Sequence, residues 1–165
     1  PAPGRRNLQH FLKTPMVDGL HPVAWPALAE WMRSHPDAWV VTDVKADNLP
    51  ILRELAREPD LRQRIIPQIY AIAQYEKVEA MGFPQVWLTL YRRDYPNWAL
   101  ERIFQKYPIA ALVCPPRRAL QGGLALALSR RGVPVFVHTV NDEGERGNLL
   151  KRGVHGVYTD TLDNR

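Results

Sequence analysis

Short apolar segments alternate with longer segments in which apolar residues recur at helical spacing. The apolar runs predict strands at residues 38–45, 64–70, 85–91, 109–114, 134–140 and 154–159. The intervening periodicity predicts helices at residues 22–33, 48–58, 73–81, 96–106, 118–131 and 145–152. Pro15 and Gly19 interrupt the first twenty residues, which we expect to be irregular.

The order of these elements indicates a fold class. Alternating strands and helices are typical of parallel strands joined by right-handed crossovers. The strands are apolar runs rather than polar alternations, as expected when both faces of a sheet are covered. We therefore expect an α/β fold with a parallel sheet. A doubly wound sheet and a barrel both fit this pattern.

Composition limits the functions that need consideration. The net charge of +5 arises from basic residues interspersed with acidic ones, without the clustering that nucleic-acid binding requires. We expect no nucleic-acid partner and favour a small anionic ligand. No apolar run is long enough to cross a bilayer, so we expect a soluble protein, either cytoplasmic or periplasmic. Cys114 is the only cysteine, which excludes an intrachain disulfide.

Asp43 and Lys45 lie two residues apart on one predicted strand, so their side chains share a face. An acid and a base buried there are costly unless they meet a metal, an anion or each other. Two interpretations stay open. The pair is either a metal-binding carboxylate beside a phosphate-binding ammonium, or a structural ion pair.

Polar residues also gather near the ends of later strands: Gln68, Tyr70, Thr89, Tyr91, Arg92, His138 and Asn141. Active sites of parallel barrels lie at the carboxyl ends of the strands, so this set predicts a substrate pocket. The alternative is a set of structural polar groups, with His138 a buried core histidine. In that interpretation Asn141 and Asp142 start a turn as a cap. Separately, Asn48 is expected to cap the helix at 48–58.

Read together, these segments resemble the glycerophosphodiester phosphodiesterase family. Residues 41–45 (VTDVK) are similar to its fourth-strand motif, a carboxylate–x–Lys pair in which most members have Glu where Asp43 stands. Residues 67–70 and 88–92 resemble a bacterial branch of the family. The most specific match is the tail, where 138–141 (HTVN) and 153–160 (GVHGVYTD) are similar to Trp-Thr-Val-Asn, Gly-Val-Asp-Gly and a final Thr-Asp.

The resemblance spans residues 14–162 and implies a TIM-like (β/α)8 barrel. Its implied activity is metal-dependent hydrolysis of a glycerophosphodiester to an alcohol and glycerol 3-phosphate. Asp43 would bind Mg²⁺ or Ca²⁺, and Lys45 would be the catalytic residue that neutralises phosphate charge. The substrate-binding residues would be Gln68, Tyr70, Thr89, Tyr91, Arg92, His138 and Asn141.

The family's two acid–base histidines and its acidic–x–acidic metal motif are not found in this sequence. A whole barrel needs about 250 residues, and this chain of 165 begins with Pro1. We therefore expect residues 1–165 to be a single domain, the C-terminal portion of a barrel without its first strands. The alternatives are a non-catalytic ligand-binding module on a shortened barrel and an unrelated α/β nucleotide or nucleic-acid binder.

The chain by itself should not hydrolyse glycerophosphocholine above background. Removing a general acid–base alone lowers turnover by about 10²–10⁴-fold, and the missing metal ligands add to that loss. A coupled assay for released glycerol 3-phosphate, with Mg²⁺ or Ca²⁺ added, measures it. Robust metal-dependent turnover would contradict the expectation that the chain is incomplete.

Overall fold

The structure is a computed structural model that describes residues 8–14, 20–44 and 47–162. The chain divides into two compact units, Pro1–Trp39 and Val40–Arg165. The first unit contains helices α1 (Leu8–Lys13) and α2 (Trp25–Ser34). The expectation of an irregular start is wrong for α1, where Leu8, Phe11 and Leu12 recur at helical spacing.

The second unit holds a parallel array of short strands. They are β1 (Val40–Val41), β2 (Ile65–Ile66), β3 (Gln68–Ile69), β4 (Trp87–Thr89), β5 (Ala111–Cys114), β6 (Val135–Val137) and β7 (Gly156–Val157). β1 pairs with β2, and β3 to β7 form one sheet in sequence order, all of them parallel. The predicted α/β class, with parallel strands alternating with helices, is confirmed.

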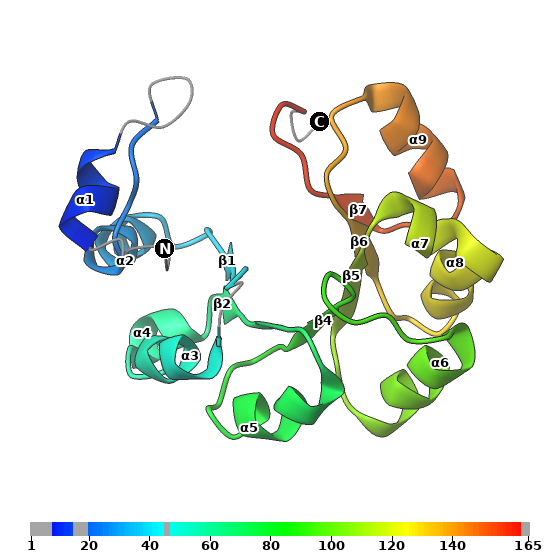
Figure 1. Cartoon of the computed structure of the whole chain (residues 1–165), viewed down its shortest axis with the longest axis horizontal. Helices are drawn as coiled ribbons and strands as arrows, with labels where there is room; N and C mark the ends of the chain where they lie inside the picture. Colours follow the sequence, from blue (N-terminus) through cyan, green and yellow to red (C-terminus); the bar gives the residue numbers. More distant parts are fainter. Residues whose placement is uncertain (1–7, 15–19, 45–46, 163–165) are drawn as a thin grey trace, which may run out of the picture. The chain divides into compact units, whose positions relative to one another are not determined.

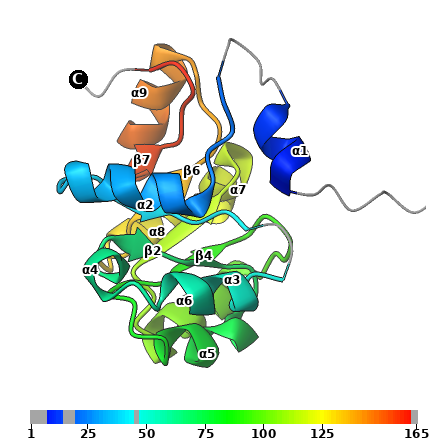
Figure 2. The same cartoon turned by 90° about the vertical axis from the view of Figure 1, so that its left-hand side faces the viewer.

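Helices follow nearly every strand of this unit. They are α3 (Leu49–Leu55), α4 (Pro59–Arg62), η2 (Ile72–Gln74), α5 (Tyr75–Glu79), α6 (Asn97–Lys106), α7 (Pro116–Leu120), η3 (Gln121–Gly123), α8 (Leu124–Ser129) and α9 (Glu143–Lys151). Figure 1 shows them on one side of the strands. Right-handed crossovers between strands in consecutive order produce this one-sided arrangement. α9 lies beside β7 in both views (Figure 1 and Figure 2).

The two faces of the sheet have different partners. Leu88, Leu112 and Val135 are paired neighbours on the helix-covered face and are fully buried. The opposite, inner face carries an apolar cluster built on Ile66, Trp87, Ala111 and Val113, with Val41, Ala110, Phe136 and Tyr158 packed against it. The rings of Trp87 and Phe136 stack with centroids 4.6 Å apart. The array therefore buries both of its faces.

The sheet curves strongly toward its inner face. β3 and β7 are separated by four strand spacings, which is about 19 Å in a flat sheet. Yet Nε2 of Gln68, on β3, donates to the hydroxyl of Tyr158, just after β7, at 3.2 Å. The described strands do not close into a barrel, because no ladder among them joins β1 to β7.

Two expected elements are divided by residues whose backbone cannot continue them. The strand at 64–70 becomes β2 and β3 on either side of Pro67, which has no N–H to donate. The helix at 118–131 is instead α7, η3 and α8, because Gly122 and Gly123 adopt φ of +59° and +68°. In the part of the chain that the structure describes, no helix is long and apolar enough to cross a membrane.

Gly153→Ala should destabilise the fold far more than Gly132→Ala. Both glycines have positive φ, so alanine costs about 1–2 kcal/mol at each from backbone strain. A Cβ at Gly153 would in addition lie 2.7 Å from Cα of Leu126, whereas at Gly132 it would meet nothing within 4 Å. Overpacking should add about 1–3 kcal/mol at Gly153. Urea unfolding of the two variants measures the difference, and equal losses would contradict the close approach.

Candidate functional site

A cavity of about 320 Å³ opens on the inner face, where the strands end. Its lining residues are Val41, Asp43, Gln68, Thr89, Tyr91, Val113, His138, Thr139 and Tyr158. Side chains alternate between faces along a strand, which is why Val41 and Asp43 both reach it, as do Thr89 and Tyr91. The expected gathering of Asp43, Gln68, Thr89, Tyr91 and His138 is thus present in the fold. We call this cavity the strand-end pocket.

The floor of the strand-end pocket is buried and its rim is exposed. Thr89 and Gln68 are 1% and 5% exposed, and Val113 beside them is buried. Tyr91 is 55% exposed at the rim, and its ring centroid lies 6.1 Å from that of His138. Polar groups are therefore buried at the base, whereas the aromatic ring of Tyr91 is exposed at the entrance near His138.

Gln68 is held by both its backbone and its side chain. Its N–H donates to Oγ1 of Thr42 at 3.2 Å, and its carbonyl accepts from Nδ2 of Asn48 at 3.0 Å. Its side-chain amide donates to the Tyr158 hydroxyl. These bonds orient the amide of Gln68 across the pocket, so its position does not depend on a ligand.

Asn48 occupies the N-cap position of α3, as predicted, but its side chain makes no capping hydrogen bond there. The side chain is 1% exposed, and besides its bond to Gln68 it accepts from Nε2 of Gln74 at 2.8 Å. Oε1 of Gln74 accepts in turn from the N–H of Tyr70 at 2.8 Å. This chain of amides fixes the backbone at the end of β3.

Asp43 is the single acidic residue in the pocket lining that the structure describes. Its Oδ1 accepts a hydrogen bond of 2.6 Å from the hydroxyl of Tyr70. The guanidinium of Arg92 lies 5.2 Å from the centroid of the Tyr70 ring. Tyr70 and Arg92 do not line the cavity; Tyr70 bonds to Asp43, and Arg92 lies over the Tyr70 ring.

Burial is the main cause of the altered acidity of the two tyrosines. For Tyr70, burial, the hydrogen bond to Asp43 and the charge of Asp43 all raise the pKa well above its usual range. Burial raises the pKa of Tyr158 to about 12; the Gln68 hydrogen bond opposes this rise, and Asp43 adds to it. Both phenols therefore remain protonated at physiological pH, so Tyr70 can donate to Asp43.

Lys45, the expected catalytic residue, is outside the described residues. Asn141 does not line the pocket but joins the ends of β6 and β7. Its Oδ1 accepts from the N–H of Asp160 at 2.9 Å and from Oγ1 of Thr159 at 3.0 Å. The expected cap is provided by Asp142, which accepts from the N–H of Glu145 at 2.7 Å at the start of α9.

Sequence reasoning did not include Val41, Val113, Thr139 and Tyr158 in the pocket. Tyr158 was the most accessible to inference, because it lies two residues after Gly156, the ladder partner of Phe136. The same alternation that selects Thr89 and Tyr91 therefore selects Tyr158. Val41 and Val113 have no polar group that would mark them as site residues in the sequence, and they contribute only to the shape of the pocket.

The described residues do not amount to a divalent-cation site. No three His, Cys, Asp or Glu side chains are grouped to hold a metal in the described ranges, and Asp43 is one carboxylate among neutral groups. Ca²⁺ takes six to eight oxygen ligands, and Mg²⁺ requires octahedral geometry. A metal at Asp43 would need further ligands from elsewhere.

Comparison with known proteins does not assign this chain to a family. No protein-family model matches this chain, and no curated protein was found to match it. Fold and pocket together define an α/β protein with a curved parallel sheet and a polar pocket at the strand ends.

Tyr158→Phe should reduce the loss of stability at alkaline pH. The folded-state pKa of about 12 exceeds the ordinary value of 10.0, so the folded state binds this proton more tightly. That contribution is complete below pH 10 and is lost as the pH rises toward 12. Urea unfolding at about pH 7, 9 and 11 measures it.

Near pH 7 the free energy of unfolding of Tyr158→Phe should be lower only by the lost hydrogen bond with Gln68, about 0.5–1.5 kcal/mol. The additional loss at alkaline pH should be smaller in the variant than in the original protein. An unchanged decrease between pH 9 and 11 would show that Tyr158 does not titrate from a buried state.

Proposed function

We propose that the strand-end pocket binds the polar part of a glycerophosphodiester, and that the chain contributes substrate-binding residues to a phosphodiesterase. The reaction is hydrolysis of the diester to an alcohol and glycerol 3-phosphate. The observation that carries the proposal is the convergence of Asp43, Gln68 and His138 on one pocket. They come from three separate segments that resemble the same family.

The chain topology supports the same proposal. Parallel strands in consecutive order, with helices on one side and a concave inner face, are the arrangement from which a (β/α)8 barrel is built. A doubly wound sheet would instead reverse its strand order at a switch point. We propose that residues 40–162 form part of such a barrel, with the pocket at the face that barrel enzymes use.

The pocket offers groups suited to a polar ligand. Gln68, Thr89 and Tyr91 carry hydrogen-bonding groups toward the cavity, and the carboxylate of Asp43 accepts from hydroxyls. His138 adds a ring nitrogen at the entrance. A cavity of about 320 Å³ is within the range of small-molecule sites. These residues bind and orient a ligand, whereas the proton transfers and any metal chemistry need groups beyond the described residues.

A second candidate is a non-catalytic module that binds the same class of ligand. It is favoured by one observation: in the described lining, Asp43 has no second carboxylate beside it with which to hold a cation. In this case Asp43 repels a phosphate instead of bridging to it through a metal.

The effect of Asp43→Asn distinguishes the two candidates. In the phosphodiesterase, Ca²⁺ or Mg²⁺ should tighten glycerophosphocholine binding at least about tenfold, an effect of roughly 1.4 kcal/mol. Asp43→Asn should abolish that gain, because a neutral amide is a poor cation ligand. In the binding module the cation should have no effect, and Asp43→Asn should bind the anion equally well or more tightly. Calorimetric titration with and without the cation measures this.

Gln68→Leu tests the pocket independently of any metal. This substitution keeps the side-chain volume but removes the amide. Both candidate functions therefore predict that the variant binds glycerophosphocholine more weakly. For Asp43→Asn the matched control is Asp37→Asn, because Asp37 is an exposed carboxylate that does not line the pocket. Unchanged binding in Gln68→Leu, or no binding by the original protein, would refute both candidates.

A further inference from the structure

A second depression of about 710 Å³ lies on the helix-bearing side of the same unit. Its lining residues are Pro115, Arg117, Arg118, Leu120, Gln121 and Arg152. We call it the arginine groove. It shares no lining residue with the strand-end pocket. The part of the lining that the structure describes contains three guanidinium groups and no carboxylate.

Arg152 reaches the groove because of a close backbone approach. It ends α9 and is followed by Gly153, whose missing side chain lets the chain pass against the backbone of Leu126 in α8. A Cβ at Gly153 would lie 2.7 Å from Cα of Leu126. Arg152 is therefore held near the α7–α8 connection, far in sequence from Arg117.

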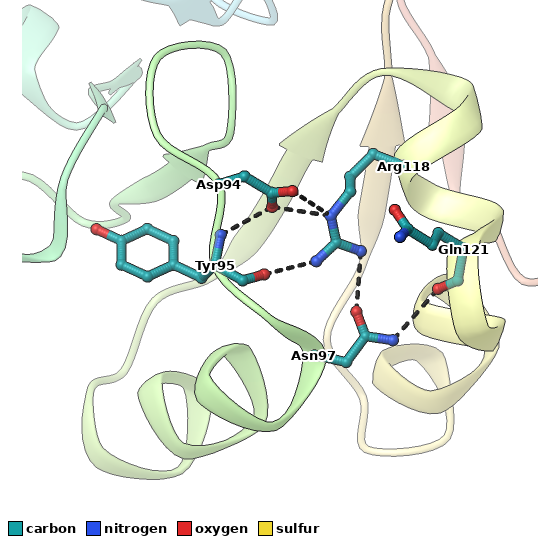
Figure 3. A network of polar contacts seen from close by, with 5 residues as sticks. All are labelled: Asp94, Tyr95, Asn97, Arg118 and Gln121. Atoms are coloured by element: carbon teal, nitrogen blue, oxygen red, sulfur yellow. Dashed lines mark hydrogen bonds and ion pairs between the residues drawn. The ribbon is translucent and has the colours of Figure 1, made fainter.

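Arg118 is held by a network of hydrogen bonds with Asp94, Tyr95 and Asn97 (Figure 3). Its Nε donates to Oδ1 of Asp94 at 2.8 Å, its Nη2 to the carbonyl of Tyr95 at 2.6 Å, and its Nη1 to Oδ1 of Asn97 at 2.9 Å. Nδ2 of Asn97 donates to the carbonyl of Gln121 at 3.2 Å. The side chain of Arg118 is only 10% exposed, so the floor of the groove is pre-organised.

The charge in the groove is unbalanced. Among the ion pairs given by the described residues, that of Arg118 with Asp94 is the one that involves a groove arginine. Arg117 and Arg152 are exposed and add two positive charges to one depression. Holding like charges together is unfavourable unless an anion joins them. Guanidinium groups bind phosphate oxygens in bidentate geometry.

We propose that the arginine groove is a binding site for a phosphate monoester, held by Arg117 and Arg152 over the floor that Arg118 fixes. The site is independent of the proposed phosphodiester pocket. The phosphate belongs either to a soluble compound or to a lipid headgroup, and the chemistry of recognition is the same. The volume of the groove leaves room for the organic part of the ligand.

Titration with inorganic phosphate at constant ionic strength tests the proposal. Backbone amide NMR shifts of Gln121, Gly122 and Arg152 should change and saturate, while those of Gln68 and Thr89 in the strand-end pocket should not. Arg117→Gln and Arg152→Gln should each weaken phosphate binding at least about tenfold. Lys151→Gln is the matched control, because it removes the same charge from the adjacent residue, which does not line the groove.

Equal weakening in Lys151→Gln and Arg152→Gln, or shifts that never saturate, would overturn the proposal and leave only a general effect of net charge. Arg118→Lys would disturb the floor and is not a suitable test. Because the pocket signals are monitored separately, failure here leaves the proposed phosphodiester function intact.

Vesicles distinguish the two sources of the phosphate group. Phosphatidylcholine vesicles containing phosphatidic acid should sediment the protein, in a manner that requires Arg117 and Arg152, if the headgroup belongs to a lipid. Phosphate binding without such sedimentation assigns the groove to a soluble phosphate monoester. Failure of both measurements would refute the site.

Discussion

The site depends on the strong curvature of the sheet, which allows a hydrogen bond between the Gln68 amide and the Tyr158 hydroxyl. This bond joins strands that a flat sheet would hold about 19 Å apart, so it forms only when the sheet is strongly curved. Curvature follows from the connections, because consecutive right-handed crossovers place the helices on one side. The inner face is then narrow enough for side chains from distant strands to meet.

Curvature also explains why the inner face changes character along the strands. Near the strand starts, Trp87 stacks on Phe136 and fills the interior with apolar surface. Thr89, two residues after Trp87, and Gln68, the ladder partner of Trp87, bring polar side chains to the same face, and hydrogen bonds hold Gln68 in place. A packed base beneath a polar mouth allows the pocket to be rigid without being filled. The stability of the fold and the shape of the site therefore depend on the same alternation of side chains.

The sequence predicted the positions of most strands and several of the residues that face the pocket, since both depend on local periodicity. Asp43, Gln68, Thr89 and Tyr91 were accessible in this way. The sequence predicted Asn48 as the N-cap of α3 but could not predict that its side chain would bond to Gln68, because that bond depends on a contact twenty residues away. The sequence also predicted one continuous helix across Gly122, where the structure has a break. The hydrogen bond from Asn97 to the carbonyl of Gln121 favours a turn there. Non-local contacts decided these local outcomes.

Charge placement limits how a ligand with an anionic and a hydroxyl-bearing end can lie in the pocket. Asp43 is the acidic group of the described lining, and its partner Tyr70 keeps its proton because burial raises the pKa of that phenol. A phosphate beside Asp43 would meet a like charge, whereas a hydroxyl there would donate to it. The guanidinium of Arg92 lies over the Tyr70 ring. Without a neighbouring cation, therefore, the hydroxyl end is favoured at Asp43.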